Sequence, residues 1–114
     1  MSDPRPETIN DFHIGATKIF TVDITHDGDT PDIRNDTVEV TFEEKATALT
    51  YTFSGDVTTY GENGIAYFHL YPVDTAEIAN TGDYWYEVLW KYDDKEVIVA
   101  EGGCRIKRRR SPSE

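Results

Sequence analysis

The chain has 114 residues and a mass of 13.0 kDa, which fits one domain with a single core. Hydrophobic residues make up 38%, too many for a disordered chain, and the mean hydropathy of -0.58 speaks against a membrane protein. The formal net charge of -11 predicts a body that repels nucleic acid and anionic lipid, so we expect neither as a direct partner.

Residues 1–11 form a predicted N-terminal arm. They lack the basic segment followed by an apolar one that marks a secretory signal. From residue 12 to residue 107 the apolar residues recur with the two-residue period of half-buried strands. We therefore predict one β-domain over residues 12–107, followed by a basic tail over residues 108–114.

About seven strands are predicted in this domain, because runs of alternating apolar and polar residues are separated by turn signals at intervals of about ten residues. The strand segments are residues 20–24, 38–42, 49–53, 65–70, 84–90, 97–100 and 104–107. The last two indicate one strand broken at Gly102 and Gly103, and Asp93 and Asp94 suit a hairpin turn before it. This pattern predicts an all-β, antiparallel sandwich.

The one short helical window, residues 73–79, has Asp74 or Thr75 as its expected cap. It comes shortly before the stretch GDYWYEVLWKY, which packs five aromatic side chains into residues 82–92. In immunoglobulin-like sandwiches a tyrosine at such a corner packs inward and its hydroxyl group bonds to the backbone. Asp74, Gly82 and Tyr84 are the candidates for this corner.

Two residues after this tyrosine, Tyr86 stands where antibody domains carry a cysteine. The chain has a single cysteine, Cys104, so no internal disulfide can form and packing must join the sheets. We expect Cys104 to be a reduced thiol near the final strand.

Three segments within residues 12–107 have the sequences GATKIFTVDI, VEVTFEEKATALTYTFSG and DTAEIANTGDYWYEVLWKYDDKEVIVAEGGCRI. They resemble small phage and prophage virion proteins, including the immunoglobulin-like N-terminal domain of phage baseplate upper proteins. The matching positions are Gly15, Thr17, Phe20, Asp74, Thr75, Gly82, Tyr84, Tyr86, Glu87 and Gly103. Cys104 and Arg105 replace the apolar closing residues of the family pattern.

The resemblance implies an immunoglobulin-like fold and a non-enzymatic structural role in a phage particle, in the tail or baseplate, the neck or the capsid decoration. The implied partners are other virion proteins, with a homo-oligomer in the assembled particle. The implied locations are the virion and, during assembly, the host cytoplasm. No cofactor is implied.

The C-terminal residues differ sharply in charge from the rest of the chain. Residues 105–114 carry five basic residues and one acidic residue, a net charge of +4, whereas residues 1–104 carry six basic and 21 acidic residues, a net charge of -15. The interpretations are a solvated end, a contact with the acidic body of a neighbouring copy, or a nucleic-acid patch. The expected interface residues are Trp85, Tyr71, Lys107, Arg108, Arg109 and Arg110.

A carbohydrate-binding module is the rival interpretation, with Trp85 and some of Tyr60, Tyr71 and Tyr92 as an exposed platform for sugar rings. The burial of Trp85 and Trp90 discriminates between the two functions.

Catalytic and metal sites receive little support from the sequence. His13, His26 and His69 are far apart in the chain, and none lies beside a Ser or Cys in a nucleophile turn, so no enzyme is predicted. The acidic loop at residues 26–36 is the best calcium candidate, with Asp27, Asp29 and Asp32 as oxygen ligands. It does not match an EF-hand, and a plain solvated loop is the alternative.

Overall fold

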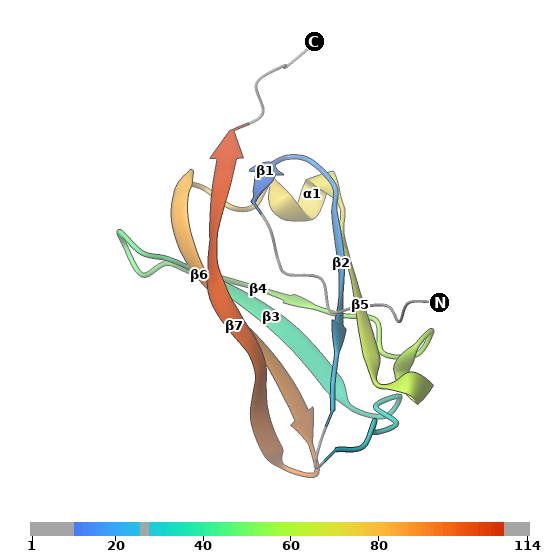
Figure 1. The fold of residues 1–114 in the computed structure, drawn as a ribbon. Helices are drawn as coiled ribbons and strands as arrows, with labels where there is room; N and C mark the ends of the chain where they lie inside the picture. The colour runs from blue at the N-terminus through green and yellow to red at the C-terminus, as the bar shows by residue number, and fades with distance from the viewer. Residues whose placement is uncertain (1–10, 26–27, 109–114) are drawn as a thin grey trace.

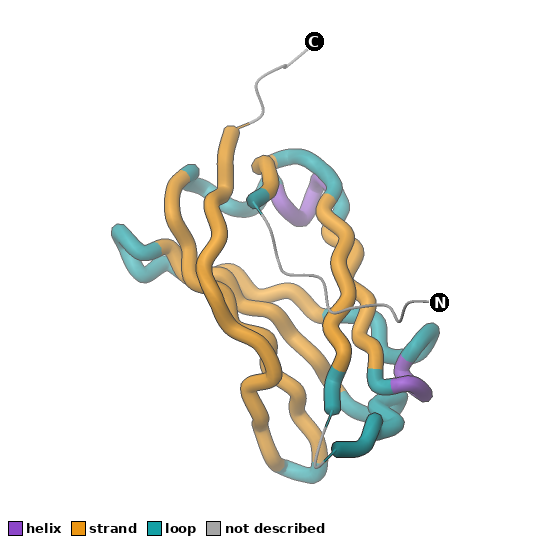
Figure 2. The backbone as a smooth tube through the Cα atoms, in the orientation of Figure 1, coloured by secondary structure: helices purple, strands orange, loops and turns teal. Residues whose placement is uncertain are grey.

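The computed structural model describes residues 11–25 and 28–108. Its strands form two sheets, a five-stranded sheet in the order β1-β7-β6-β3-β4 and a two-stranded sheet of β2 and β5. Figures 1 and 2 show β2 and β5 as a separate layer beside the larger sheet. The elements are β1 (Phe12–Ile14), β2 (Lys18–Asp23), β3 (Thr37–Glu44), β4 (Thr50–Ser54), the 3-10 turn η1 (Gly61–Asn63), β5 (Ile65–Leu70), α1 (Pro72–Thr75), β6 (Gly82–Tyr92) and β7 (Lys95–Arg108). The all-β prediction is confirmed.

The core lies between the two sheets and is built from alternate residues of each strand. Phe20 of β2 and Phe68 of β5 stack at 4.8 Å between ring centroids. Phe42 of β3 is fully buried and meets Phe12 of β1 edge-on at 5.4 Å. Each of these ring pairs lies within one sheet, and burying such a side chain contributes about 1.5–3 kcal/mol to the stability of the core. Leu49 lies just before β4 and is exposed, so the predicted strand over residues 49–53 begins one residue too early.

Strand β1 corrects the prediction of a purely antiparallel sandwich. It pairs parallel with the end of β7, with Phe12 opposite Ile106 and Ile14 opposite Arg108. The other strand pairs of the described residues are antiparallel. A three-residue strand is too short to show a period, so the alternation pattern did not find it.

Strand β7 is continuous from Lys95 to Arg108, so the predicted break at Gly102 and Gly103 is wrong. A Cβ atom at Gly102 would lie 2.8 Å from the Tyr86 hydroxyl oxygen, which means that the glycine makes room for the Tyr86 ring. The irregularity lies elsewhere. Val88 pairs with Ala100 and Leu89 with Ile98, which leaves one extra residue in β7 as a bulge.

Helix α1 is shorter than predicted and is capped differently. Its N-cap is Tyr71, and the Asp74 carboxylate accepts a hydrogen bond from the Tyr71 N–H at 2.8 Å. Asp74 is therefore the third helical residue of a capping box, and neither Asp74 nor Thr75 is the N-cap. No helix among residues 11–25 and 28–108 is long and apolar enough to cross a membrane.

The hairpin between β6 and β7 turns at Asp93 and Asp94, as predicted. Both residues have positive φ angles, 47° and 62°, and Tyr92 pairs with Lys95 across the turn. Positive φ at both central positions is the type I′ geometry that matches the twist of a hairpin.

Candidate interaction surfaces

The predicted corner residues have structural roles. Tyr84 is fully buried, and its hydroxyl group donates a hydrogen bond to the Asn80 carbonyl at 2.6 Å. Burial, helped by the negative charge of Glu44, raises the pKa of Tyr84 to about 12. Gly82 begins β6 with a φ of 137°, in the region that favours glycine.

Thr75 makes a tertiary connection that sequence reasoning missed. Its hydroxyl group donates to the Ala16 carbonyl at 2.8 Å and accepts from the Gly15 N–H at 3.0 Å. These bonds join α1 to the β1–β2 turn. The sequence indicates only a helix cap at Thr75, so it does not predict this contact.

The outer face of the five-stranded sheet carries Trp85, which is 54% exposed, whereas Trp90 is buried. The Lys45 ammonium group lies 3.8 Å from the centroid of the Trp85 ring, a cation–π contact. Beside the ring is a shallow hollow of about 330 Å³. We call this surface the Trp85 face; it consists of Thr41, Glu43, Lys45, Trp85, Glu87 and Glu101.

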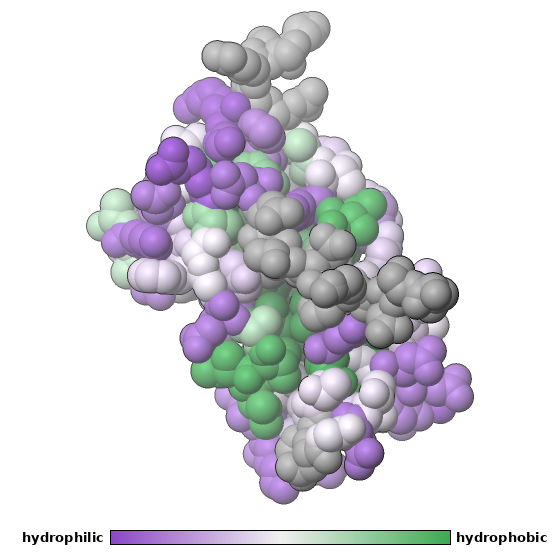
Figure 3. Space-filling model, viewed as in Figure 1, coloured by the Kyte–Doolittle hydropathy of each residue, from purple (hydrophilic) through white to green (hydrophobic). Residues whose placement is uncertain are grey.

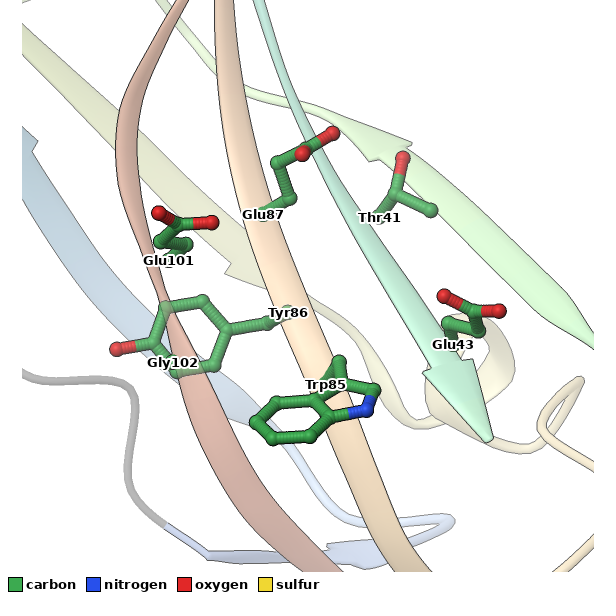
Figure 4. Close-up of a pocket in the computed structure, with 7 residues that line it drawn as sticks. All are labelled: Thr41, Glu43, Trp85, Tyr86, Glu87, Glu101 and Gly102. Carbon is green, nitrogen blue, oxygen red and sulfur yellow. The ribbon is translucent and has the colours of Figure 1, made fainter. Parts of the chain in front are cut away.

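The Trp85 face is acidic. Figure 4 shows its three carboxylates on three neighbouring strands, Glu43 on β3, Glu87 on β6 and Glu101 on β7, with Trp85 beside them. Register places Glu87 directly opposite Glu101 and Glu43 opposite Trp85. None of the ion pairs found among the described residues involves these three glutamates.

A second exposed feature is a line of rings along β5. The ring centroids of Tyr60 and Tyr67 are 6.0 Å apart, those of Tyr67 and His69 6.3 Å, and those of His69 and Tyr71 4.0 Å. Tyr60 and Tyr71 are about half exposed, at 46% and 55%. We call these four residues the β5 aromatic row.

A hollow of about 260 Å³ lies along the β5 aromatic row, with Ser54 and Asp56 on its other side. The Thr59 hydroxyl group and the N–H and hydroxyl groups of Thr58 donate hydrogen bonds to the Asp56 carboxylate. They hold the pKa of Asp56 at about 2, so this carboxylate is charged at neutral pH.

The structure separates aromatic residues that the sequence grouped together. Tyr71 follows β5 in the smaller sheet, whereas Trp85 lies on β6 in the larger one. Tyr92 stacks on Trp90 at 4.0 Å and belongs to neither surface. Of the predicted platform, only Tyr60 and Tyr71 share one row.

The basic end is partly held by acidic neighbours. Arg105 forms an ion pair with Asp83 at 3.0 Å, and Lys107 forms one with Asp11 at 3.7 Å. Arg108 is the last described residue and is exposed. Arg109 and Arg110 lie outside the described residues. Figure 3 shows a hydrophilic surface over the C-terminal end of β7 and an apolar patch lower on the same view.

The described residues do not bring the calcium-ligand and catalytic candidates together into a site. Asp32 pairs with Arg34 at 2.6 Å, and the hydrogen bond from this guanidinium lowers the pKa of Asp32. Asp27 and His26 lie outside the described residues. Within residues 11–25 and 28–108, no group of three or more His, Cys, Asp or Glu residues could hold a metal ion.

Cys104 should react slowly with thiol reagents while the chain is folded. It is a free, half-buried thiol in β7, and burial, with the negative charge of Asp11, raises its pKa to about 11. A shift of two units lowers the thiolate fraction at pH 8 roughly a hundredfold. We expect a disulfide reagent to label the folded chain at least tenfold more slowly than the chain in urea. Equal rates, or a cysteine-dependent dimer on a non-reducing gel, would contradict this prediction.

In comparisons with known proteins, no family model and no curated protein sequence matches the chain.

Proposed function

We propose that the protein is a non-enzymatic structural subunit of a phage particle, in the tail or baseplate, neck or capsid decoration, which binds other virion proteins through the Trp85 face. The observation that carries the proposal is a half-exposed tryptophan on the outer face of the five-stranded sheet. Tryptophan is enriched among the residues that dominate protein–protein binding.

The strand order supports an immunoglobulin-like assignment, which agrees with the resemblance of the three sequence segments to virion proteins. Sheets β7-β6-β3-β4 and β2-β5 correspond to strands G-F-C-C′ and B-E of a variable-type immunoglobulin domain. The buried Tyr84, with its hydroxyl group bonded to the backbone four residues earlier, corresponds to the tyrosine corner.

Complementation of phage particles tests this function. A lysogen that lacks the gene would be supplied with wild-type protein, Trp85→Ala or Ile19→Ala, and its particles would be purified on a density gradient. Ile19 is a matched control because it is 49% exposed on β2, in the other sheet. We expect wild type and Ile19→Ala in the particle band and at least tenfold less Trp85→Ala, because a typical hot-spot loss of about 2 kcal/mol lowers affinity roughly thirtyfold.

Absence of the wild-type protein from the particles would contradict the proposed function. Equal incorporation of wild type and Trp85→Ala would contradict the assignment of the interface to the Trp85 face. A circular dichroism spectrum of each variant separates a lost contact from a lost fold.

Carbohydrate binding is the second candidate, and the β5 aromatic row favours it. Exposed rings in line with a charged carboxylate, Asp56, can stack on sugar rings and accept hydrogen bonds from their hydroxyl groups. A glycan array with wild type and Tyr71→Ala tests this candidate. Binding that Tyr71→Ala abolishes and Trp85→Ala leaves intact would support it, and an array without any binding would contradict it.

A further inference from the structure

We propose that the Trp85 face binds the basic end, Arg108 to Arg110, of a second copy of the same chain. This inference names a partner for the surface described above and therefore rests on the proposed function. It gives the homo-oligomer expected for a virion subunit a specific contact, in which one copy donates its end and the next copy accepts it.

The acceptor side carries three carboxylates, and the Lys45 ammonium group on the same face offsets only part of their negative charge. Glu87 and Glu101 face each other across β6 and β7, and like charges directly opposite destabilise a strand pair. Glu43 adds a third carboxylate one strand away. A cationic partner would relieve this repulsion, which makes the face complementary to a basic segment.

The tryptophan ring shows which chemistry suits this surface. Lys45 already places its ammonium group over the ring at 3.8 Å, so a cation is accommodated there next to the three carboxylates. Arginine stacks on aromatic rings and binds carboxylates with two parallel hydrogen bonds, which makes it a better partner than lysine for a face that combines both groups.

The donor side carries the matching charge. Arg105 and Lys107 form ion pairs with Asp83 and Asp11, whereas Arg108 is exposed at the end of β7 and is followed in the sequence by Arg109 and Arg110. No ion pair between Arg108 and another described residue is found. The sequence of the basic end therefore offers three arginines to a face that carries three glutamates and one lysine, Lys45.

Distance disfavours a contact between the end and the Glu87–Glu101 pair of its own chain. Glu101 and Arg108 lie on the same continuous strand, seven residues apart, which is about 23 Å at 3.3 Å per residue. The Cα atom of Arg110 can lie at most about 8 Å from that of Arg108. To reach its own Glu87–Glu101 pair, the end would have to reverse direction at Arg108 and run fully extended back along β7, with the arginine and glutamate side chains stretched as well. Such an arrangement costs conformational freedom, so a second copy is the favoured partner.

The contact has a defined symmetry. Donor and acceptor are different surfaces of the chain, so the interface is heterologous and its repetition produces a ring or an open row. Because the charges are exposed, the contact should weaken with salt.

Sedimentation velocity of the full-length protein tests the proposal at 50 mM and 500 mM NaCl. We expect concentration-dependent association of wild type at low salt and at least tenfold weaker association at high salt. The acceptor variant Glu87→Gln/Glu101→Gln and the donor variant Arg108→Gln/Arg109→Gln/Arg110→Gln should each lose association. Glu62→Gln/Glu77→Gln is the matched control, since it removes the same charge from exposed residues outside β6 and β7 and should associate like wild type.

Mixing the two defective variants gives the sharpest result. The acceptor variant keeps an intact basic end and the donor variant keeps an intact Trp85 face, so the mixture should form a complex of one copy of each and grow no further. Failure of this pair to associate, or association of either variant alone at wild-type strength, would overturn the proposal.

The outcome is separable from that of the proposed function. If wild type stays monomeric at all concentrations and yet enters purified particles, the inference fails and the proposed function stands. If the protein is absent from particles but associates in the mixing experiment, the proposed function fails and the contact between copies stands. Substitutions are used instead of truncation because β7 continues through Arg108 and pairs there with Ile14 of β1.

Discussion

Gly64→Ala should lower the free energy of unfolding by about 3 kcal/mol, the largest effect expected of a single methyl group in this chain. Gly64 has a φ of 73°, in the left-handed region that costs other residues roughly 1–2 kcal/mol. An added Cβ atom would also lie 2.6 Å from the Thr30 Cγ2 atom and 2.9 Å from the Ile24 carbonyl oxygen. The backbone oxygen cannot move away freely, because the Gly64 carbonyl accepts the Ile24 N–H at 2.8 Å.

Gly28→Ala is the matched control for this variant. Gly28 also has a positive φ, 84°, but a Cβ atom added there would have no described atom within 4 Å. The Gly28→Ala variant should lose only about 1 kcal/mol of the free energy of unfolding, which is the cost of the left-handed backbone conformation alone. Urea denaturation followed by tryptophan fluorescence measures both. Equal losses of stability in the two variants would contradict the prediction, because they would mean that the atoms around the added Cβ at position 64 move away without cost.

Tyr84→Phe should lower the free energy of unfolding by about 1 kcal/mol at neutral pH, because it removes the hydrogen bond from the buried hydroxyl group to the Asn80 carbonyl. The ring itself stays in place, so the core keeps its packing. Tyr51→Phe is a suitable control, since its hydroxyl group accepts a longer bond, 3.2 Å, from an exposed backbone N–H. An unchanged denaturation midpoint for Tyr84→Phe would contradict the assignment of Tyr84 to a tyrosine corner.

The dependence of stability on pH above pH 10 provides a second test of the role of Tyr84. Its pKa is raised from about 10 to about 12, so the folded chain favours the neutral phenol. This contribution to stability is complete below pH 10 and is lost as the pH rises toward 12. Wild type should therefore lose more stability than Tyr84→Phe between pH 10 and pH 12, which denaturation curves across that range would measure. Parallel losses would contradict the raised pKa.

The sequence predicted the elements in which burial alternates regularly. Val38, Val40 and Phe42 are buried along β3 as expected, because a sheet with one solvated face imposes a period of two. The β1–β7 pair could not be found in this way. It is three residues long and joins positions more than 90 residues apart, so only the tertiary fold reveals it.

The candidate surfaces were harder to predict, because they depend on register and on the assignment of strands to sheets. The bulge in β7 places Glu101 opposite Glu87, whereas Leu89 pairs with Ile98 before it. A count from the hairpin without this extra residue would put Glu101 on the inner face. The β5 aromatic row did have a signal, since Tyr67, His69 and Tyr71 alternate along one strand face.

The parallel pairing of β1 with β7 also determines how the domain bears tension. If neighbours in an assembly pulled on the two ends of the chain, the force would enter β1 at Phe12 and leave β7 at Arg108, along strands that run in the same direction. The hydrogen bonds between parallel strands are evenly spaced, so they would be loaded in shear, together, and not opened one after another. A strand of only three residues, which also contributes Phe12 to the core, would thus resist extension of the domain between Phe12 and Arg108.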